Sequence, residues 1–212
     1  MVSRSMKRLF DLLIATLALV LLSPLIAIVA VLVRLRMGRP VLFRQVRPGW
    51  HECPFTVLKF RTMRQARSEE ELLQPDGERL TPLGRRLRRL SLDELPQLWN
   101  VVRGDMSLVG PRPLLTEYLQ RYTPEQRRRH EVRPGITGWA QVHGRQDIPF
   151  SKRLELDVWY VDHRSFALDM RILLMTFLRV FGGGGIHSGQ DVVEVDDLGL
   201  HPRTRKTREG AK

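Results

Sequence analysis

The chain has 212 residues, a length that suits one domain with a substantial core and short appendages. It carries 35 basic and 23 acidic residues for a net charge of +12, and thirty of the basic residues are arginine. This balance favours polyanionic partners, namely nucleic acid, anionic lipid headgroups or phosphorylated substrates. The single cysteine excludes an internal disulfide framework and a multi-cysteine zinc site, and the 42% content of hydrophobic residues argues against bulk disorder.

The first predicted element is an apolar helix. Residues 12–33 are 22 consecutive uncharged residues, which as a helix reach roughly 33 Å, the thickness of a bilayer core. Ser23-Pro24 lies at the middle, where the proline predicts a kink and the Ser23 hydroxyl is a candidate partner for the freed backbone groups. Basic residues flank both ends, so the positive-inside rule draws both to the cytoplasmic side. The residues alone leave open a hairpin that re-enters one leaflet and a single kinked span.

Short β-prone runs follow at residues 40–44 and 55–60, and the turn-rich residues between them predict a small hairpin. Residues 81–90 form a basic amphipathic pattern, with leucines four and seven positions after Leu83. Such a helix suits an anionic membrane surface or, equally, a solvated charged face over a core contact. A new helix is predicted from Ser91 to about Val102, with Ser91 and Glu94 as a capping box.

The second half of the chain alternates Gly/Pro loops with helices. Residues 109–113 and 132–138 predict tightly shaped loops, and residues 153–161 and 165–181 predict helices. The predicted fold class is α+β and mainly helical, with amphipathic surface helices and a small β-hairpin around a compact domain. The predicted boundaries are a membrane segment at 1–36, the compact domain at 37–181 and a flexible tail at 182–212.

Asp93 and Glu94 are the residues best suited to chemistry. Motifs for phosphate loops, dinucleotide binding, zinc proteases and nucleophile elbows are missing from the sequence. In the first turn of a helix, the unsatisfied N–H groups would lower the pKa of both carboxyls and attract phosphate. Because adjacent helical residues point about 100° apart, one carboxylate can attack while the other faces a cation such as Mg²⁺. The alternative is that this acidic first turn only stabilises the helix.

Several basic residues are candidates for binding phosphate. Arg112 lies between Pro111 and Pro113, whose stiff backbone fixes the direction of the guanidinium. Lys59 and Arg61 on the β-prone run and Arg145 after a glycine are further candidates, although each alone is typical of surface charge. Asp169 inside an apolar helix requires a partner, for which an arginine is the simplest choice, or a function.

The motifs together resemble the bacterial sugar transferase family, specifically its small monotopic polyprenyl-phosphate phosphoglycosyl transferases. The resemblance covers nearly all of residues 5–180, in order. It is carried by Lys7-Arg-Leu-Phe-Asp11 with Ser23-Pro24, Lys59-Phe-Arg-Thr-Met63, Ser91-Leu-Asp-Glu-Leu-Pro-Gln-Leu-Trp-Asn100, Gly104-Asp-Met-Ser-Leu-Val-Gly-Pro-Arg-Pro113 and Arg133-Pro-Gly-Ile-Thr-Gly-Trp-Ala-Gln-Val-His-Gly-Arg145. His143 stands where family members often have Asn, which bears on sugar choice.

The resemblance implies a Mg²⁺-dependent transfer of a sugar 1-phosphate from a UDP-sugar to undecaprenyl phosphate, with release of UMP, as the first membrane step of glycoconjugate assembly. It implies that Asp93 is the nucleophile of an aspartyl phosphosugar intermediate and that Glu94 joins it at the metal site. It also implies a re-entrant N-terminal helix at the cytoplasmic face of the bacterial inner membrane. The expected phosphate-binding residues are Lys59, Arg61, Arg88, Arg112 and Arg145, with Asp157 and Asp169 as further candidates.

Two other kinds of protein fit parts of the sequence. A non-catalytic protein that binds membrane surfaces or nucleic acid would explain the arginines. Nucleic-acid grooves use stacking aromatic rings, however, and the arginine-rich stretches at 85–89 and 127–129 contain none, so no nucleic-acid partner is expected. A glycosyltransferase that moves only the sugar would release UDP instead of UMP.

Overall fold

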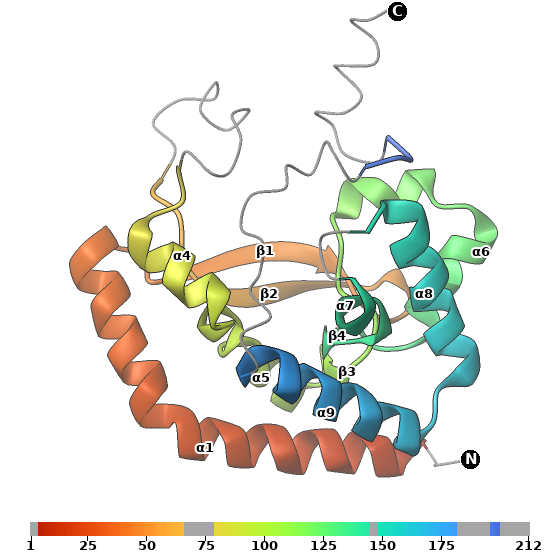
Figure 1. Ribbon diagram of the computed structural model, residues 1–212, viewed down its shortest axis with the longest axis horizontal. Helices are drawn as coiled ribbons and strands as arrows, with labels where there is room; N and C mark the ends of the chain where they lie inside the picture. Colours follow the sequence, from red (N-terminus) through yellow and green to blue (C-terminus); the bar gives the residue numbers. More distant parts are fainter. Residues whose placement is uncertain (1–3, 66–78, 145–147, 182–195, 200–212) are drawn as a thin grey trace, which may run out of the picture.

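The chain begins with a 34-residue helix, α1 (Arg4–Met37), which bends sharply part-way along its length (Figure 1). The computed structural model describes residues 4–65, 79–144, 148–181 and 196–199. Pro24 lies inside α1, so the predicted break is a bend in a continuous helix. Pro24 has no N–H for the carbonyl of Val20, and the Ser23 hydroxyl donates to that carbonyl instead at 2.8 Å. The predicted contact between the Ser23 hydroxyl and a freed backbone group is therefore present.

The two arms of α1 pack against different parts of the same body. Ala15 on the N-terminal arm belongs to the main core with Val101 of α5 (Gln97–Arg103) and Met106. On the C-terminal arm, Val29 and Val33 pack into a second core. Each arm thus has one face covered by protein, while most apolar side chains on its other faces are exposed.

Polar contacts fix both ends of α1 to the body. Near the N-terminus, Arg8 donates to the carbonyls of Val101 and Val102 at 2.6 and 2.9 Å. At the C-terminus, the Arg61 guanidinium donates to the carbonyls of Gly38 and Arg39 at 2.9 and 3.1 Å, and also to that of Met37. The helix and the rest of the chain are consequently tied together at both ends.

The predicted β-hairpin is confirmed. Strands β1 (Leu42–Pro48) and β2 (Pro54–Phe60) pair antiparallel, joined through the short 3₁₀ turn η1 (Trp50–Glu52). Asn100 of α5 docks against β2, because its side-chain amide accepts from the N–H of Leu58 at 3.1 Å and donates to the carbonyl of Thr56 at 2.8 Å. These two hydrogen bonds fasten the hairpin to α5.

The helix predicted over residues 81–90 is present as α4 (Pro82–Arg89), capped by Thr81, whose hydroxyl accepts from the N–H of Gly84 at 2.9 Å. Only glycine fits at position 84, since a Cβ there would lie 1.9 Å from the carbonyl oxygen of Thr62.

The single helix predicted from Ser91 to Val102 is wrong. The chain makes a 3₁₀ turn, η2 (Leu92–Glu94), and α5 begins only at Gln97. Ser91 is in the left-handed region with φ 55° and its side chain caps nothing, so the predicted capping box is also wrong. Pro96 explains the late start of α5, because proline has no N–H to donate within a longer helix and is favoured at the beginning of one.

A second, parallel pair of strands was not predicted. Strand β4 (Gly135–Thr137) lies within the loop predicted at 132–138, and β3 (Ser107–Val109) ends where the loop predicted at 109–113 begins. The backbone approaches closely here, since a Cβ on Gly110 would lie 2.3 Å from the carbonyl oxygen of Arg133. The N–H of Gly110 donates to Thr137 at 2.9 Å, and that of Gly135 donates to Pro111 at 3.0 Å. These contacts fix the start of the loop that carries Arg112.

The remaining elements are helical. Both long predicted helices are confirmed, as α8 (Phe150–His163) and α9 (Phe166–Phe181), and α9 lies beside the N-terminal arm of α1 (Figure 1). The shorter elements are η3 (Thr116–Arg121), α6 (Pro124–Arg127), η4 (Arg128–Glu131) and α7 (Trp139–His143). The architecture is mainly helical, as predicted, with the predicted hairpin and one further small sheet.

Most of the predicted tail lies outside the described residues. Residues 196–199 are described, and they contact the body: Asp197 accepts from the N–H of Ser151 at 3.1 Å, and the carbonyl of Gly199 accepts from Arg121 at 2.5 Å.

Within the described part of the chain, α1 is the one helix that is long and apolar enough to cross a membrane.

Candidate active site

Asp93 and Glu94 lie in the η2 turn between α4 and α5, with the β-hairpin and the Arg112 loop beside them. Asp93 is 7% exposed, yet its carboxylate makes no hydrogen bond or ion pair with any residue that the structure describes. Buried carboxylates are ordinarily paired, because burying a charge is costly. The free oxygens of Asp93 are therefore available to an incoming group.

Glu94 is held by two cations. Its Oε1 accepts from Lys59 Nζ at 2.8 Å and from Arg112 Nη2 at 2.6 Å. Burial alone would raise the pKa of Glu94, but the charges of Arg112 and Lys59 outweigh it and hold the pKa well below its ordinary value. Glu94 is thus ionised at any physiological pH.

The pKa of Asp93 moves in the opposite direction. Burial raises it, and so does the negative charge of Glu94, while Lys59, Arg88 and Arg112 act against the increase. The prediction that a helix N-terminus lowers the pKa of both carboxyls is thus wrong for Asp93. The reason is that burial of the Asp93 side chain and the negative charge of Glu94 outweigh the nearby cations.

Three of the five predicted phosphate-binding residues meet at this pair of acids. Lys59 and Arg112 contact Glu94 directly. Arg88 extends from α4, where its Nε donates to the Thr62 hydroxyl at 3.1 Å, and its charge lowers the pKa of Asp93. The turn is therefore surrounded by positive charge suited to phosphate oxygens.

The other two predicted phosphate ligands are placed differently. The Arg61 guanidinium is engaged by the backbone carbonyls that follow α1, so its observed role is to hold the end of that helix. Arg145 lies outside the described residues. A guanidinium that binds backbone carbonyls cannot be distinguished by sequence from one that binds phosphate, because both need the same donors.

The two further acidic candidates are buried in ion pairs. Asp157 pairs with Arg129, and Asp169 accepts from Lys7 at 2.6 Å and from the Tyr160 hydroxyl at 2.7 Å. The partner of Asp169 is thus a lysine on α1 instead of the expected arginine. Asp169 fastens α9 to the N-terminal arm of α1.

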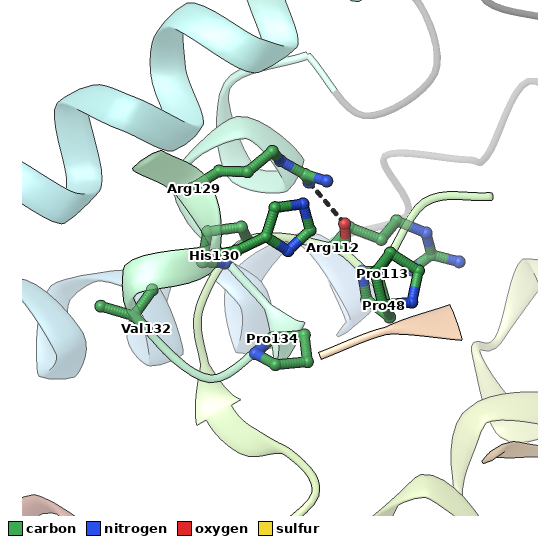
Figure 2. A pocket seen from close by; sticks show the side chains of 8 residues that line it. Pro48, Arg112, Pro113, Arg129, His130, Val132 and Pro134 are labelled. Carbon is green, nitrogen blue, oxygen red and sulfur yellow. Dashed lines mark hydrogen bonds between the residues drawn. The ribbon is translucent and has the colours of Figure 1, made fainter. Parts of the chain in front are cut away.

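The loop that carries Arg112 has a second side, away from Glu94. Figure 2 shows a small hollow there, lined by Pro48, Pro111, Arg112, Pro113, Arg129, His130, Val132 and Pro134, in which the Arg129 guanidinium points at the backbone carbonyl of Arg112. Sequence reasoning missed Arg129, because it is one of three successive arginines and nothing in the pattern separates it from its exposed neighbours.

The donor set at the acidic pair fits a hard cation that keeps much of its own hydration. No cluster of three or more His, Cys, Asp or Glu side chains suited to a metal is present among the described residues. Asp93 and the second oxygen of Glu94 are nevertheless free of hydrogen bonds within that part of the chain. Mg²⁺ commonly binds through one or two carboxylates, with waters and substrate phosphates as the remaining ligands.

A buried free carboxylate beside a cluster of cations suits phosphate groups, and the apolar helix α1 is consistent with association with a membrane. Comparison with known families agrees: the bacterial sugar transferase model matches residues 2–183, so the chain belongs to that family.

Among its relatives, the uncharacterized sugar transferase EpsL of Bacillus subtilis (strain 168) is 55% identical over 187 residues, which are 88% of this chain and 93% of EpsL. The UDP-glucose:undecaprenyl-phosphate glucose-1-phosphate transferase of Escherichia coli (strain K12) is 40% identical over 190 residues, 85% of this chain and 41% of that protein. The UDP-N-acetylgalactosamine-undecaprenyl-phosphate N-acetylgalactosaminephosphotransferase of Aeromonas hydrophila is 42% identical over 188 residues, 84% and 44% respectively. The chain thus spans nearly all of EpsL and less than half of the other two.

Proposed function

We propose that this protein transfers a sugar 1-phosphate from a UDP-sugar to undecaprenyl phosphate and releases UMP, with Asp93 as the nucleophile. The observation that carries the proposal is the contrast within one turn: Glu94 is held by two cations while the adjacent, buried Asp93 has no partner among the described residues. Relatives in the same family are named for this transfer with glucose and N-acetylgalactosamine.

The reaction divides into two displacements at one phosphorus atom. In the first, an Asp93 oxygen attacks the phosphorus that bears the sugar, and the bond from that phosphorus to the bridging oxygen breaks. UMP leaves with the bridging oxygen, and the sugar phosphate stays on Asp93 as an acyl phosphate. In the second, an oxygen of undecaprenyl phosphate attacks the same phosphorus, the bond to Asp93 breaks, and the carboxylate is regenerated.

The surrounding residues prepare Asp93 for this attack. Lys59 and Arg112 are occupied by Glu94, so they contribute positive charge near the phosphate without tying up the nucleophile. The pKa of Asp93 is raised by burial, and a more basic carboxylate is a better nucleophile as long as it is ionised. Arg88 adds a third cation beside the same carboxylate.

Mg²⁺ is the cation we propose for this site, where Asp93 and the second oxygen of Glu94 would hold it. Bound there, it would neutralise phosphate oxygens during the displacements. A metal and three cationic side chains nearby would reduce the electrostatic repulsion between the two anionic substrates.

We also propose that α1 enters one leaflet from the cytoplasmic face of the bacterial inner membrane and returns. Both ends of the helix are fastened to the same body, through Arg8 at one end and Arg61 at the other. A helix that crossed the bilayer would have to release one of these ends. Apolar side chains exposed near the bend, among them Val20 and Leu21, would lie in the lipid.

The proposed activity is tested by release of UMP. The purified protein in lipid nanodiscs is incubated with undecaprenyl phosphate, Mg²⁺ and a panel of UDP-sugars that includes UDP-glucose and UDP-N-acetylgalactosamine. We expect UMP with at least one of them, together with a lipid-linked sugar diphosphate. Release of UDP instead, or no nucleotide product with any UDP-sugar, would contradict the proposal.

A further inference from the structure

Behind the Arg112 loop lies a buried ion pair that the proposed chemistry does not use. Arg129 of η4 and Asp157 of α8 pair at 2.7 Å, and their side chains are only 1% and 4% exposed. Both Nε and Nη2 of Arg129 donate to the same Asp157 oxygen, at 3.1 and 2.7 Å. The pair therefore holds the guanidinium plane in one orientation.

The donors of Arg129 that remain reach two further groups. Its Nη2 donates to the backbone carbonyl of Arg112 at 2.6 Å, as the dashed line in Figure 2 shows. Its Nη1 donates to the Tyr122 hydroxyl at 3.4 Å. Arg112 in turn donates to Glu94 at 2.6 Å, so an unbroken series of short contacts runs from α8 to the acidic pair.

We propose that Arg129, oriented by Asp157, is a positioning residue that sets the backbone of Arg112 and so aims its guanidinium at Glu94. This rests on the proposed function, because Arg112 matters only if the acidic pair is the site of reaction. The backbone hydrogen bonds described above hold the loop at Gly110 and Pro111, at its start. Arg129 is the anchor at Arg112 itself.

The free-energy cost of burying both charges indicates that this ion pair does more than pack η4 against α8. Two charges buried in a protein interior add little net stability compared with apolar residues of the same size. An adjacent pair on the same two elements serves as a comparison: Arg128 of η4 and Asp162 of α8 contact each other while partly exposed to solvent. That outer pair can join the two elements, whereas the buried pair is the one that reaches the Arg112 carbonyl.

The test compares matched variants of the full-length protein. Arg129→Lys keeps the charge opposite Asp157, so the fold is retained, but an ammonium cannot donate in the fixed fork of a guanidinium. We expect kcat for UMP release to fall about 100-fold, the scale of a misplacement of about 1 Å at an active site. Arg128→Lys and Asp162→Asn are the controls on the outer pair, and both are expected to stay within about twofold of the unmodified protein.

A double-mutant cycle separates positioning from stability. If Arg129 acts through Arg112, then Arg112→Lys and the double variant Arg112→Lys/Arg129→Lys have kcat values within about twofold of each other. If Arg129 only stabilises the fold, the two losses multiply and follow the melting temperature. Multiplicative losses would overturn the proposal.

A crystal structure of Arg129→Lys, in which the forked donation to Asp157 and to the Arg112 carbonyl is lost, gives an answer that does not depend on turnover. We expect the Arg112 guanidinium to leave hydrogen-bonding distance of Glu94, with η2 otherwise unchanged. An Arg112 that remains on Glu94 would overturn the positioning role, even if the protein is active. Conversely, an unmodified protein that releases no UMP would refute the proposed function while this structural result still decided the position of Arg112.

Discussion

Two adjacent carboxylates, Asp93 and Glu94, have opposite electrostatic environments. Glu94 receives Lys59 and Arg112, which lower its pKa, while Asp93 is buried beside it with a raised pKa and free oxygens. The charge of Glu94 draws the cations away from its neighbour. Among the described residues, the arrangement therefore leaves the oxygens of Asp93 free by satisfying Oε1 of Glu94.

Replacement of Asp93 separates activity from stability. Because the pKa of Asp93 is raised in the folded protein, its ionisation at neutral pH costs stability, and Asp93→Asn removes that cost. We expect UMP release to fall at least roughly 1,000-fold, while the melting temperature at pH 7.5 stays equal or increases. Turnover assays and thermal unfolding check both, with membrane association as the control for folding. Retention of about a tenth of the activity would contradict the nucleophile assignment.

Arg112 tests whether geometry or charge matters at the acidic pair. Arg112→Lys keeps the positive charge but loses the planar fork and the reach to Glu94, so we expect about a 100-fold decrease in kcat. The matched control is Arg44→Lys on the exposed side of the hairpin, which should leave kcat unchanged. Full activity in Arg112→Lys would show that long-range charge is sufficient there.

The pH dependence follows from the raised pKa of Asp93. Attack requires the ionised carboxylate, so activity is lost as the pH falls through that pKa, which lies above the ordinary aspartate value of 3.8. In Glu94→Gln the neighbouring negative charge is removed and the cations are released toward Asp93, so both effects lower its pKa. We expect a large loss of activity and an acidic limb displaced to lower pH. A limb displaced to higher pH would contradict this coupling.

At the scale of single elements, the sequence predicts what depends on local chemistry. The amphipathic helix over residues 81–90 and the kink at Pro24 are visible because leucine spacing and proline act over neighbouring residues. The turn at Ser91 is not visible, since nothing in the local sequence requires a serine there to be left-handed between the end of α4 and the start of α5 at Gln97. Strands β3 and β4 were missed because three-residue strands carry no periodicity.

The bend of α1 is tested through its topology. Single cysteines at Ser5 and Arg36, in a Cys53→Ser background, are expected to be protected from a membrane-impermeant reagent in intact cells and labelled after lysis. Pro24→Leu removes the bend, because the carbonyl of Val20 regains an N–H partner, and should shift position 5 toward external labelling. If position 5 is labelled from outside in the protein that retains Pro24, α1 crosses the membrane, which would contradict re-entry.

At the scale of the whole molecule, the site depends on contacts between distant parts of the chain. Lys59 comes from the hairpin, Glu94 from the turn before α5 and Arg112 from a loop fixed by β3 and β4. The motifs indicated which residues to consider, and their order in the chain agreed with one family. They did not separate Arg61, which holds α1, from Lys59, which reaches Glu94, because that difference arises only from the tertiary fold.

The central claim, a phosphosugar bonded to Asp93, is tested most directly by intact-protein mass spectrometry. The protein is incubated with Mg²⁺ and the UDP-sugar that supports UMP release, without undecaprenyl phosphate, and is quenched in acid. We predict a mass increase equal to one sugar phosphate, mapped to the peptide with Asp93, absent from Asp93→Asn, and lost again when undecaprenyl phosphate is added before the quench. Release of UMP only when undecaprenyl phosphate is present, with no adduct under any condition, would show direct transfer and contradict the account.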